Sequence, residues 1–262
     1  MAIDLEHFGV GQQLRCSSVV RAATQEHRTM ESAARALCRT LYQELRASSA
    51  AGAPRGCVLV RCYKTHPYGA LPADLQRFAR GMLAIGERPR PSMRCLALLA
   101  SAGDEPAWNS RHESRGHRAI PLPSPDLVEK APMIAQLVRD FGLELADVVE
   151  PTDRIVHDRR GKNYGVFHVE EADGSPLIPA QAEFVRRHRV RSVVGFGGLL
   201  ASGDLFAVVL FARVRIDADA ADRFRGLAID VKTTFFSFGE EHVFDPWPGA
   251  DAAEPSTTAV AT

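Results

Sequence analysis

The chain has 262 residues, of which 45% are hydrophobic and 24% charged, an ordinary composition for a globular protein with a buried core. Lys and Arg together number 32, as do Asp and Glu, so the formal net charge is zero and argues against a nucleic-acid-binding or membrane-surface role. No apolar run approaches the roughly 18 residues of a membrane helix. The N-terminal residues MAIDLEHFGVGQQLR lack the apolar core of a signal peptide. We therefore expect a cytoplasmic protein with neither a nucleic-acid nor a membrane partner.

The first part of the chain predicts two helices and two strands. Apolar side chains at three- and four-residue spacings over 29–46, TMESAARALCRTLYQELR, indicate an amphipathic helix. Three further elements are predicted in order: a strand over 56–63 (GCVLVRCY), a helix over 71–83 and a strand over 93–100 (MRCLALLA). Pro72 falls in the first turn of the second helix, where its missing N–H costs nothing.

The middle of the chain predicts a short strand followed by a divided helix. Residues 117–122, HRAIPL, indicate the strand, and Ser124 is placed to cap the helix that follows. That helix runs through VEKAPMIAQLVRDFG, where Pro132 is expected to kink or divide it. Residues 143–162 give a mixed pattern that supports no prediction.

The last third predicts a hairpin between two helices. A strand is expected over 163–169 and a short helix over 178–188, before two apolar strands over 190–200 and 204–214 joined by Ala201-Ser202-Gly203. Asp217 then caps a closing helix that reaches residue 238. The small, polar residues after Gly239 indicate a disordered tail. We therefore expect an N-terminal extension or helix over 1–28, one folded domain over 29–238 and a tail over 239–262.

This order of elements favours an α+β domain. A mainly antiparallel sheet with the helices collected on one side accommodates it, whereas a doubly wound parallel sheet needs the strict βαβ alternation that is missing. The hairpin strands are expected to be adjacent, antiparallel and central, because residues 208–211 are continuously apolar and therefore covered on both faces. A carboxylate introduced at Val209 is expected to unfold the domain.

Cysteine usage predicts buried free thiols in a reducing compartment. The five cysteines form no Cys-x-x-Cys pair; they are Cys16, Cys38, Cys57, Cys62 and Cys95. Cys57 and Cys62 are five residues apart on one predicted strand, which places them on opposite faces and argues against a shared metal.

The stretch PAWNSRHESRGHRAIPLPS, residues 106–124, carries the densest polar chemistry. HESRGH differs from the zinc-peptidase motif because its second His is at i+5, and Gly116 disfavours a helix there. Two interpretations stay open. The segment is either a solvated charged loop, or a lid over a polar pocket in which Arg111, Arg115 and Arg118 bind a carboxylate or phosphate. Trp108 and Asn109 are unusual neighbours for a free loop.

Two further places are candidate ligand contacts. His168 alternates with Phe167 and Val169 along a predicted strand and so faces the other way. The glycines of GFGG, residues 195–198, mark either close packing or a ligand lying against the backbone. We hypothesise one pocket under the 108–118 loop, lined by His117, His168 and Arg191. Haem ligation by a histidine has no supporting spacing, and no cofactor is expected.

The segments YGVFHVEEADGSPLIPAQAEFV and SVVGFGGLLASGDLFAVVLF resemble the second half of a GAF-type sensory domain. The upstream piece AGDEPAWNSRHESRGHRAIPLPS is similar to the N-terminal sensor modules of large bacterial multidomain histidine kinases. The resemblance covers roughly residues 30–238. It implies a GAF-like fold of the PAS/GAF superfamily, with a central antiparallel sheet, terminal helices packed on one face as a dimer or signalling surface, and the ligand on the opposite face.

The resulting expectation is a small-molecule sensory module of bacterial, two-component-type signal transduction. No kinase, cyclase or phosphatase motif is present, so no catalytic output is expected of this chain. The expected ligand is small and anionic, and the expected protein partner is a second copy or a signalling protein. The candidate ligand-binding residues are Trp108, Asn109, Arg111, Arg115, His117, Arg118, His168 and Arg191. The alternative is an enzyme that uses the same Arg/His pocket, although no G-x-S-x-G elbow occurs and Ser202 lies in a turn.

Overall fold

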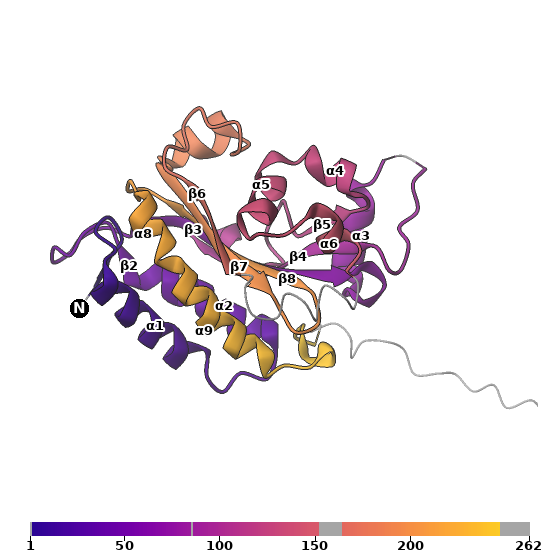
Figure 1. Cartoon of the computed structure of the whole chain (residues 1–262), viewed down its shortest axis with the longest axis horizontal. Coiled ribbons are helices and arrows are strands. Elements are labelled where there is room, and N and C mark those ends of the chain that lie inside the picture. The colour runs from indigo at the N-terminus through magenta and orange to yellow at the C-terminus, as the bar shows by residue number, and fades with distance from the viewer. Residues whose placement is uncertain (1, 85, 152–163, 247–262) are drawn as a thin grey trace, which may run out of the picture.

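The computed structural model describes residues 2–84, 86–151 and 164–246. Its centre is a six-stranded antiparallel sheet in the order β5-β4-β3-β8-β7-β6 (Figure 1). The strands are β3 (Cys57–Pro67), β4 (Arg94–Gly103), β5 (Ala119–Leu122), β6 (Tyr164–Val169), β7 (Ser192–Leu199) and β8 (Leu205–Ala212). A short parallel pair, β1 (Ile3–Asp4) and β2 (Leu45–Arg46), lies apart from it. The mixed α+β class expected from the sequence is confirmed.

One face of the sheet, called the terminal-helix face here, is covered by the first and last helices. They are α1 (Val10–Thr24), α2 (Met30–Glu44), α8 (Ala218–Asp222) and α9 (Phe224–Phe236). The expectation that helices 29–46 and 217–238 share a face is confirmed, because both contribute to one apolar cluster with the sheet (Figure 1). The N-terminal segment belongs to the same core: Phe8 stacks on Phe224 at 4.4 Å between ring centroids.

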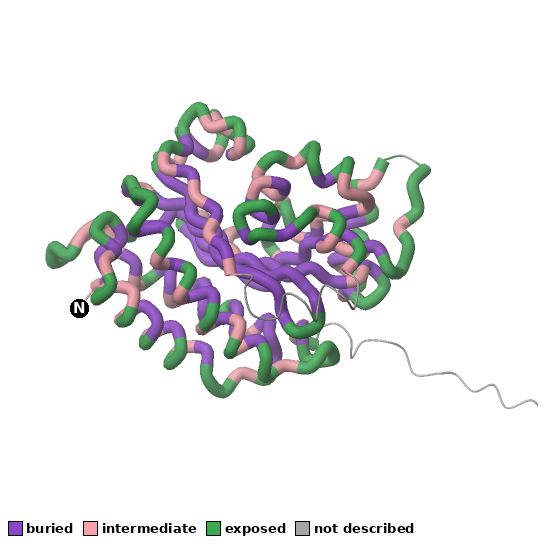
Figure 2. Tube along the Cα trace, viewed as in Figure 1, coloured by how far each residue is buried: buried purple, intermediate pink, exposed green. Residues whose placement is uncertain are grey.

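The opposite face is also covered, so the expectation that the helices collect on one side is wrong. Four short elements pack there: α4 (Pro125–Glu129), α5 (Pro132–Asp140), α6 (Leu145–Val149) and η3 (Gln181–Arg186), a π-helix. The physical reason is that β7 and β8 are buried along their whole length (Figure 2), so both sides of the strands need apolar cover. α3 (Ala73–Met82) packs near the β5 edge.

Local sequence signals set the ends of these helices. The Ser124 hydroxyl accepts a hydrogen bond from the Leu127 N–H as the cap of α4, and Pro132 separates α4 from α5 as expected. Thr29 and Ser32 form a reciprocal capping box at the start of α2. Asp217 caps α8 by accepting from the Ala220 N–H.

The strand glycines serve packing, which favours the first of the two interpretations of GFGG. A Cβ on Gly165 would lie 2.2 Å from the Phe141 Cα, and one on Gly197 would lie 2.1 Å from the Phe206 carbonyl oxygen. Bare backbone at these positions lets the end of α5 approach β6 and β7 closely. The hairpin strands β7 and β8 are adjacent and antiparallel as expected, but only β8 is central, because β7 lies next to the edge strand β6.

All five cysteines are buried and free, as expected. The prediction that Cys57 and Cys62 face opposite ways is wrong, because both lie in the terminal-helix-face core. A register shift between Cys57 and Leu59 adds one residue to β3 and restores the same facing. Burial raises the pKa of Cys16 and Cys95 to about 12, so neither is a thiolate nucleophile at neutral pH.

The chain stays packed beyond α9. η4 (Glu240–His242) follows Gly239, and Val243 is buried against α2. The first residues of the segment expected to be a tail therefore belong to the folded body; residues 247–262 of that segment, and 152–163, lie outside the described residues. We call residues 239–245 the C-terminal strap. Among the described residues, no helix combines the length and apolarity required for a membrane span.

Candidate functional site

Trp108 and Asn109 fix the start of the 108–118 loop. The Trp108 ring packs against Phe184 and His188, with centroids 5.7 Å and 4.8 Å away. The Asn109 amide accepts from the Gly103 N–H and donates to the Gly103 carbonyl. The loop is therefore anchored to the end of β4 and to η3, and the fully solvated alternative does not describe its first residues.

Arg111 and Arg118 are engaged in ion pairs. The Arg111 Nε donates to Glu31 Oε1 at 2.7 Å and its Nη1 to Asp74 Oδ2 at 3.1 Å, all three side chains being almost fully buried. Arg118 pairs with the same Asp74. Because α2 and α3 supply these carboxylates, the two guanidinium groups already have counterions.

The hypothesised pocket of His117, His168 and Arg191 does not form. His168 pairs in register with Val194, which belongs to the terminal-helix-face core, and its Nε2 lies 2.7 Å from the Ile216 carbonyl oxygen. Arg191 is exposed at the start of β7, and Arg115 is exposed in the loop. The alternation of side chains along β6 was predicted correctly. Helices cover both faces of β6, however, so His168 faces away from Phe167 and still does not face a ligand site.

Sequence reasoning missed Arg61, which lies near the middle of β3 and points to the opposite face. Its Nη1 donates to the Tyr63 hydroxyl and its Nη2 to the Ser114 hydroxyl, both at 3.2 Å. Its Nε is buried without a hydrogen-bond partner. Within the described residues, no carboxylate pairs with this guanidinium. The signal in the sequence was an Arg inside an otherwise apolar strand, VLVRCY.

The surroundings of Arg61 supply further hydrogen-bonding groups and an aromatic wall. Ser101, its register partner on β4, is 4% exposed, and its hydroxyl has no partner within the described structure. Desolvation, and then the Arg61 charge, lower the pKa of His117, an exposed residue at the edge of this group. One row along the sheet lies Phe211, whose ring contacts Phe184 at 5.0 Å between centroids. We call Arg61, Tyr63, Ser101, Ser114 and His117 the Arg61 site.

A second polar cluster lies on the terminal-helix face, where β3 meets the β7–β8 turn. Lys64 is fully buried, and its Nζ lies 2.6 Å from Asp204 Oδ2. Arg94 and the Ser202 hydroxyl bind the same carboxylate. Every charge in this cluster has a counterion, so it acts as a clamp between β3, β4 and the turn. Ser202 lies in the β7–β8 turn, as expected, and its hydroxyl bonds within that turn.

His66 makes this cluster sensitive to pH. Burial, and then the Lys64 charge, lower the pKa of His66 to about 4 from 6.5. Between pH 6.5 and 4, His66 is therefore protonated in the unfolded chain and mostly neutral in the folded protein. The stability contributed by neutral His66 is complete above pH 6.5 and is lost as pH falls toward 4.

We expect the free energy of unfolding to drop by about 2–3 kcal/mol through His66 between pH 7 and pH 4.5. Urea unfolding at the two pH values, in the wild type and in His66→Gln, measures how much of the pH-dependent loss of stability is due to His66. A His66→Gln protein that loses as much stability on acidification as the wild type would contradict it.

Comparison with known proteins assigns no family. No family model and no curated protein matches the chain. Among solved structures, it is similar to the N-acylhomoserine-lactone-dependent LuxR-family transcription factor CepR2 from Burkholderia cenocepacia, at 13% identity and a TM-score of 0.37, over 90% of this chain and 99% of that one. A likeness at this level carries no inference, so the function rests on the residues described above.

Proposed function

We propose that this protein is a small-molecule-binding sensory module whose ligand is an organic anion held at the Arg61 site. The single observation that carries the proposal is the unpaired guanidinium of Arg61 on a helix-covered sheet face. A partly buried charge without a counterion is costly, because hydroxyl groups replace only part of its hydration. A carboxylate or phosphate there would gain charge-assisted hydrogen bonds of roughly 1.5–3 kcal/mol each.

The neighbouring groups suggest the rest of the ligand. The Ser101 hydroxyl and the Arg61 Nε are buried hydrogen-bonding groups without partners, and an anionic group beside them would satisfy both. The Trp108–Phe184–Phe211 cluster offers aromatic surface one row further along the sheet. An anion with a small apolar or aromatic body therefore fits best.

The resemblance to GAF-type domains supports the sensory half of the proposal, since it implies a ligand on the face opposite the terminal helices. The same resemblance leads us to propose that α1 and α9 form the surface for a second copy. Their exposed apolar side chains are Val10, Leu14, Ile229 and Phe236. The enzyme alternative has less support, because Arg111 and Arg118 are held in ion pairs and His168 faces away.

Native mass spectrometry of the protein isolated from its own host tests the ligand. We expect a bound organic anion on the wild type and none on Arg61→Gln, because the amide keeps hydrogen bonds but not the charge. Arg191→Gln, which removes an exposed arginine, is the matched control and should retain the ligand. A ligand that persists on Arg61→Gln, or that carries no anionic group, would contradict the proposal.

A second test at position 61 measures the stability of the ligand-free protein. Arg61→Met keeps the apolar stem of the side chain and removes the unpaired charge, so we expect unfolding in urea to cost the same or roughly 1 kcal/mol more than in the wild type. A loss of several kcal/mol would mean that Arg61 is needed for folding and is not reserved for a ligand.

A further inference from the structure

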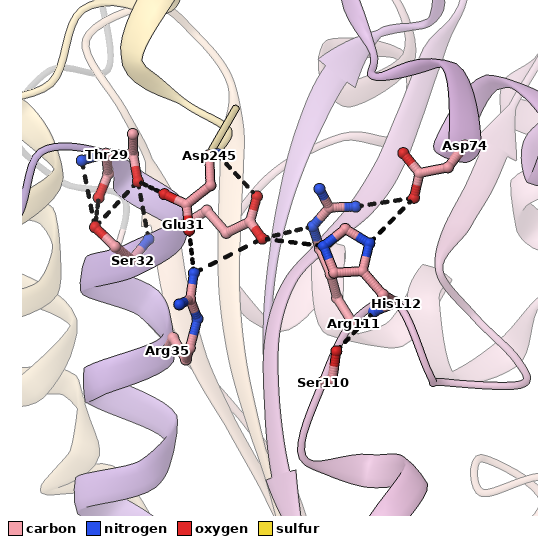
Figure 3. A network of polar contacts seen from close by, with 9 residues as sticks. All are labelled: Thr29, Glu31, Ser32, Arg35, Asp74, Ser110, Arg111, His112 and Asp245. Carbon is pink, nitrogen blue, oxygen red and sulfur yellow. Dashed lines mark hydrogen bonds and ion pairs between the residues drawn. The ribbon is translucent and has the colours of Figure 1, made fainter. Parts of the chain in front are cut away.

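One turn of the 108–118 loop connects the Arg61 site to the other side of the sheet. The Ser114 N–H donates to the Ser110 carbonyl at 3.1 Å, which closes the turn. Arg111, at the start of the turn, reaches Glu31 on α2 and Asp74 on α3 (Figure 3). Ser114, at its end, accepts from Arg61 on β3. Ser114 and Arg111 are therefore linked through one hydrogen-bonded turn.

Glu31 continues this connection to the C-terminal strap. Its Oε1 accepts from Arg111, and its Oε2 accepts from the Asp245 N–H at 3.1 Å, so one carboxylate joins the loop to the strap (Figure 3). The Glu31 N–H donates to the Val243 carbonyl at 2.8 Å. The Asp245 carboxylate also pairs with Arg35 and accepts from the Thr29 hydroxyl.

The strap is held by these contacts, by the buried side chain of Val243, by Glu240 beside Lys64 and by the Phe244 ring. The Phe244 ring centroid lies 5.6 Å from the Arg111 guanidinium carbon and 5.3 Å from the centroid of the His66 ring, which it meets edge to face. A surface cleft of about 380 Å³ runs along it, with Phe244 and Glu240 on one side and His66, Leu71 and Pro72 on the other. The strap is therefore open to solvent along this side, which favours its local release.

We propose that an anion bound at the Arg61 site releases the C-terminal strap through Ser114, Arg111 and Glu31. This inference rests on the proposed function and adds its regulation. An anion takes the Arg61 donors, so Ser114 loses its bond to β3 and the turn is free to shift. Arg111 then leaves its position against Glu31 and Phe244, and the strap loses two of the contacts that hold it, which shifts it toward release. By thermodynamic reciprocity, loosening the strap strengthens anion binding.

A ligand-free experiment tests the connection itself. Ser114→Ala removes the hydroxyl that ties the turn to Arg61, and we expect amides 239–245 to exchange hydrogen for deuterium about tenfold faster than in the wild type. Phe244→Ala, which removes the ring anchor directly, gives the reference for a released strap. Ser48→Ala is the control, because it removes a hydroxyl that accepts only a local hydrogen bond, from the Ala50 N–H. Exchange in β8 reports any global loss of stability. Unchanged strap exchange in Ser114→Ala would overturn the proposal.

Benzoate, a small aromatic carboxylate, serves as the probe for the binding step. Calorimetry is expected to show binding to the wild type that Arg61→Gln abolishes and that Phe244→Ala strengthens about fivefold. Exchange of amides 239–245 should rise when benzoate is added to the wild type and stay unchanged when it is added to Arg61→Gln. Arg61-dependent binding that leaves strap exchange and the Phe244→Ala affinity unchanged would overturn the release and leave the proposed function standing. No Arg61-dependent binding, together with faster strap exchange in Ser114→Ala, would count against the proposed function while the loop–strap connection stands.

Discussion

Replacing Asp204 by Asn is expected to lower the free energy of unfolding by about 3–5 kcal/mol, the cost of leaving a buried charge without its partner. Lys64 is fully buried, and its amine has the Asp204 carboxylate at 2.6 Å. The next carboxylate, that of Glu240, is 3.8 Å from the amine and mostly exposed, so it is a poorer counterion. Urea unfolding measured at pH 7 gives the loss directly.

Two controls separate burial from charge. Asp173→Asn breaks a pair with Arg186 in which both side chains are more than half exposed, and we expect it to cost no more than about 1 kcal/mol. The double variant Lys64→Met, Asp204→Asn removes the stranded amine and should recover part of the loss, because Arg94 still lacks its carboxylate. Equal effects of Asp204→Asn and Asp173→Asn would show that water reaches Lys64.

A carboxylate placed at Val208 is expected to unfold the protein, whereas one at Val209 should cost less by roughly 1.5–3 kcal/mol, the value of a charge-assisted hydrogen bond. Val208 is fully buried among the apolar side chains of the terminal-helix face, where an unpaired carboxylate costs several kcal/mol. Val209 lies on the other face as the register partner of Arg61 on the adjacent strand. An Asp there meets the unpaired guanidinium and substitutes for the proposed ligand.

The comparison therefore also tests the charge state of the Arg61 site. Circular dichroism and urea unfolding of Val208→Asp and Val209→Asp give the two costs, and Val209→Asp combined with Arg61→Met should be as damaging as Val208→Asp. If Val209→Asp is no better tolerated than Val208→Asp, the Arg61 guanidinium already has a counterion or cannot reach position 209.

Local signals in the sequence were sufficient to predict the six strands of the main sheet, most of the longer helices and several of their ends. Ser124, Pro132 and Asp217 act within one turn of their own positions, so their effect is local and independent of the rest of the fold. The 208–211 run predicted burial on both faces, because a strand alternates and a fully apolar strand has no face for water. The order of these elements was enough to favour an antiparallel α+β domain.

Which charges are paired could not be predicted from the sequence, because the partners come together only in the folded protein. Arg111 looked like a ligand-binding residue because its partners, Glu31 and Asp74, are 80 and 37 residues away in the sequence. Arg61 lies in an apolar strand with no polar motif around it, although the fold leaves its guanidinium on a covered sheet face without an acid among the described residues. Local spacing sets where a side chain points along its own element. Whether a side chain meets a counterion depends on long-range packing. Here the packing of α2 and α3 against the loop supplies acids to Arg111, which becomes the connection to the strap, and supplies none to Arg61, which becomes the candidate site.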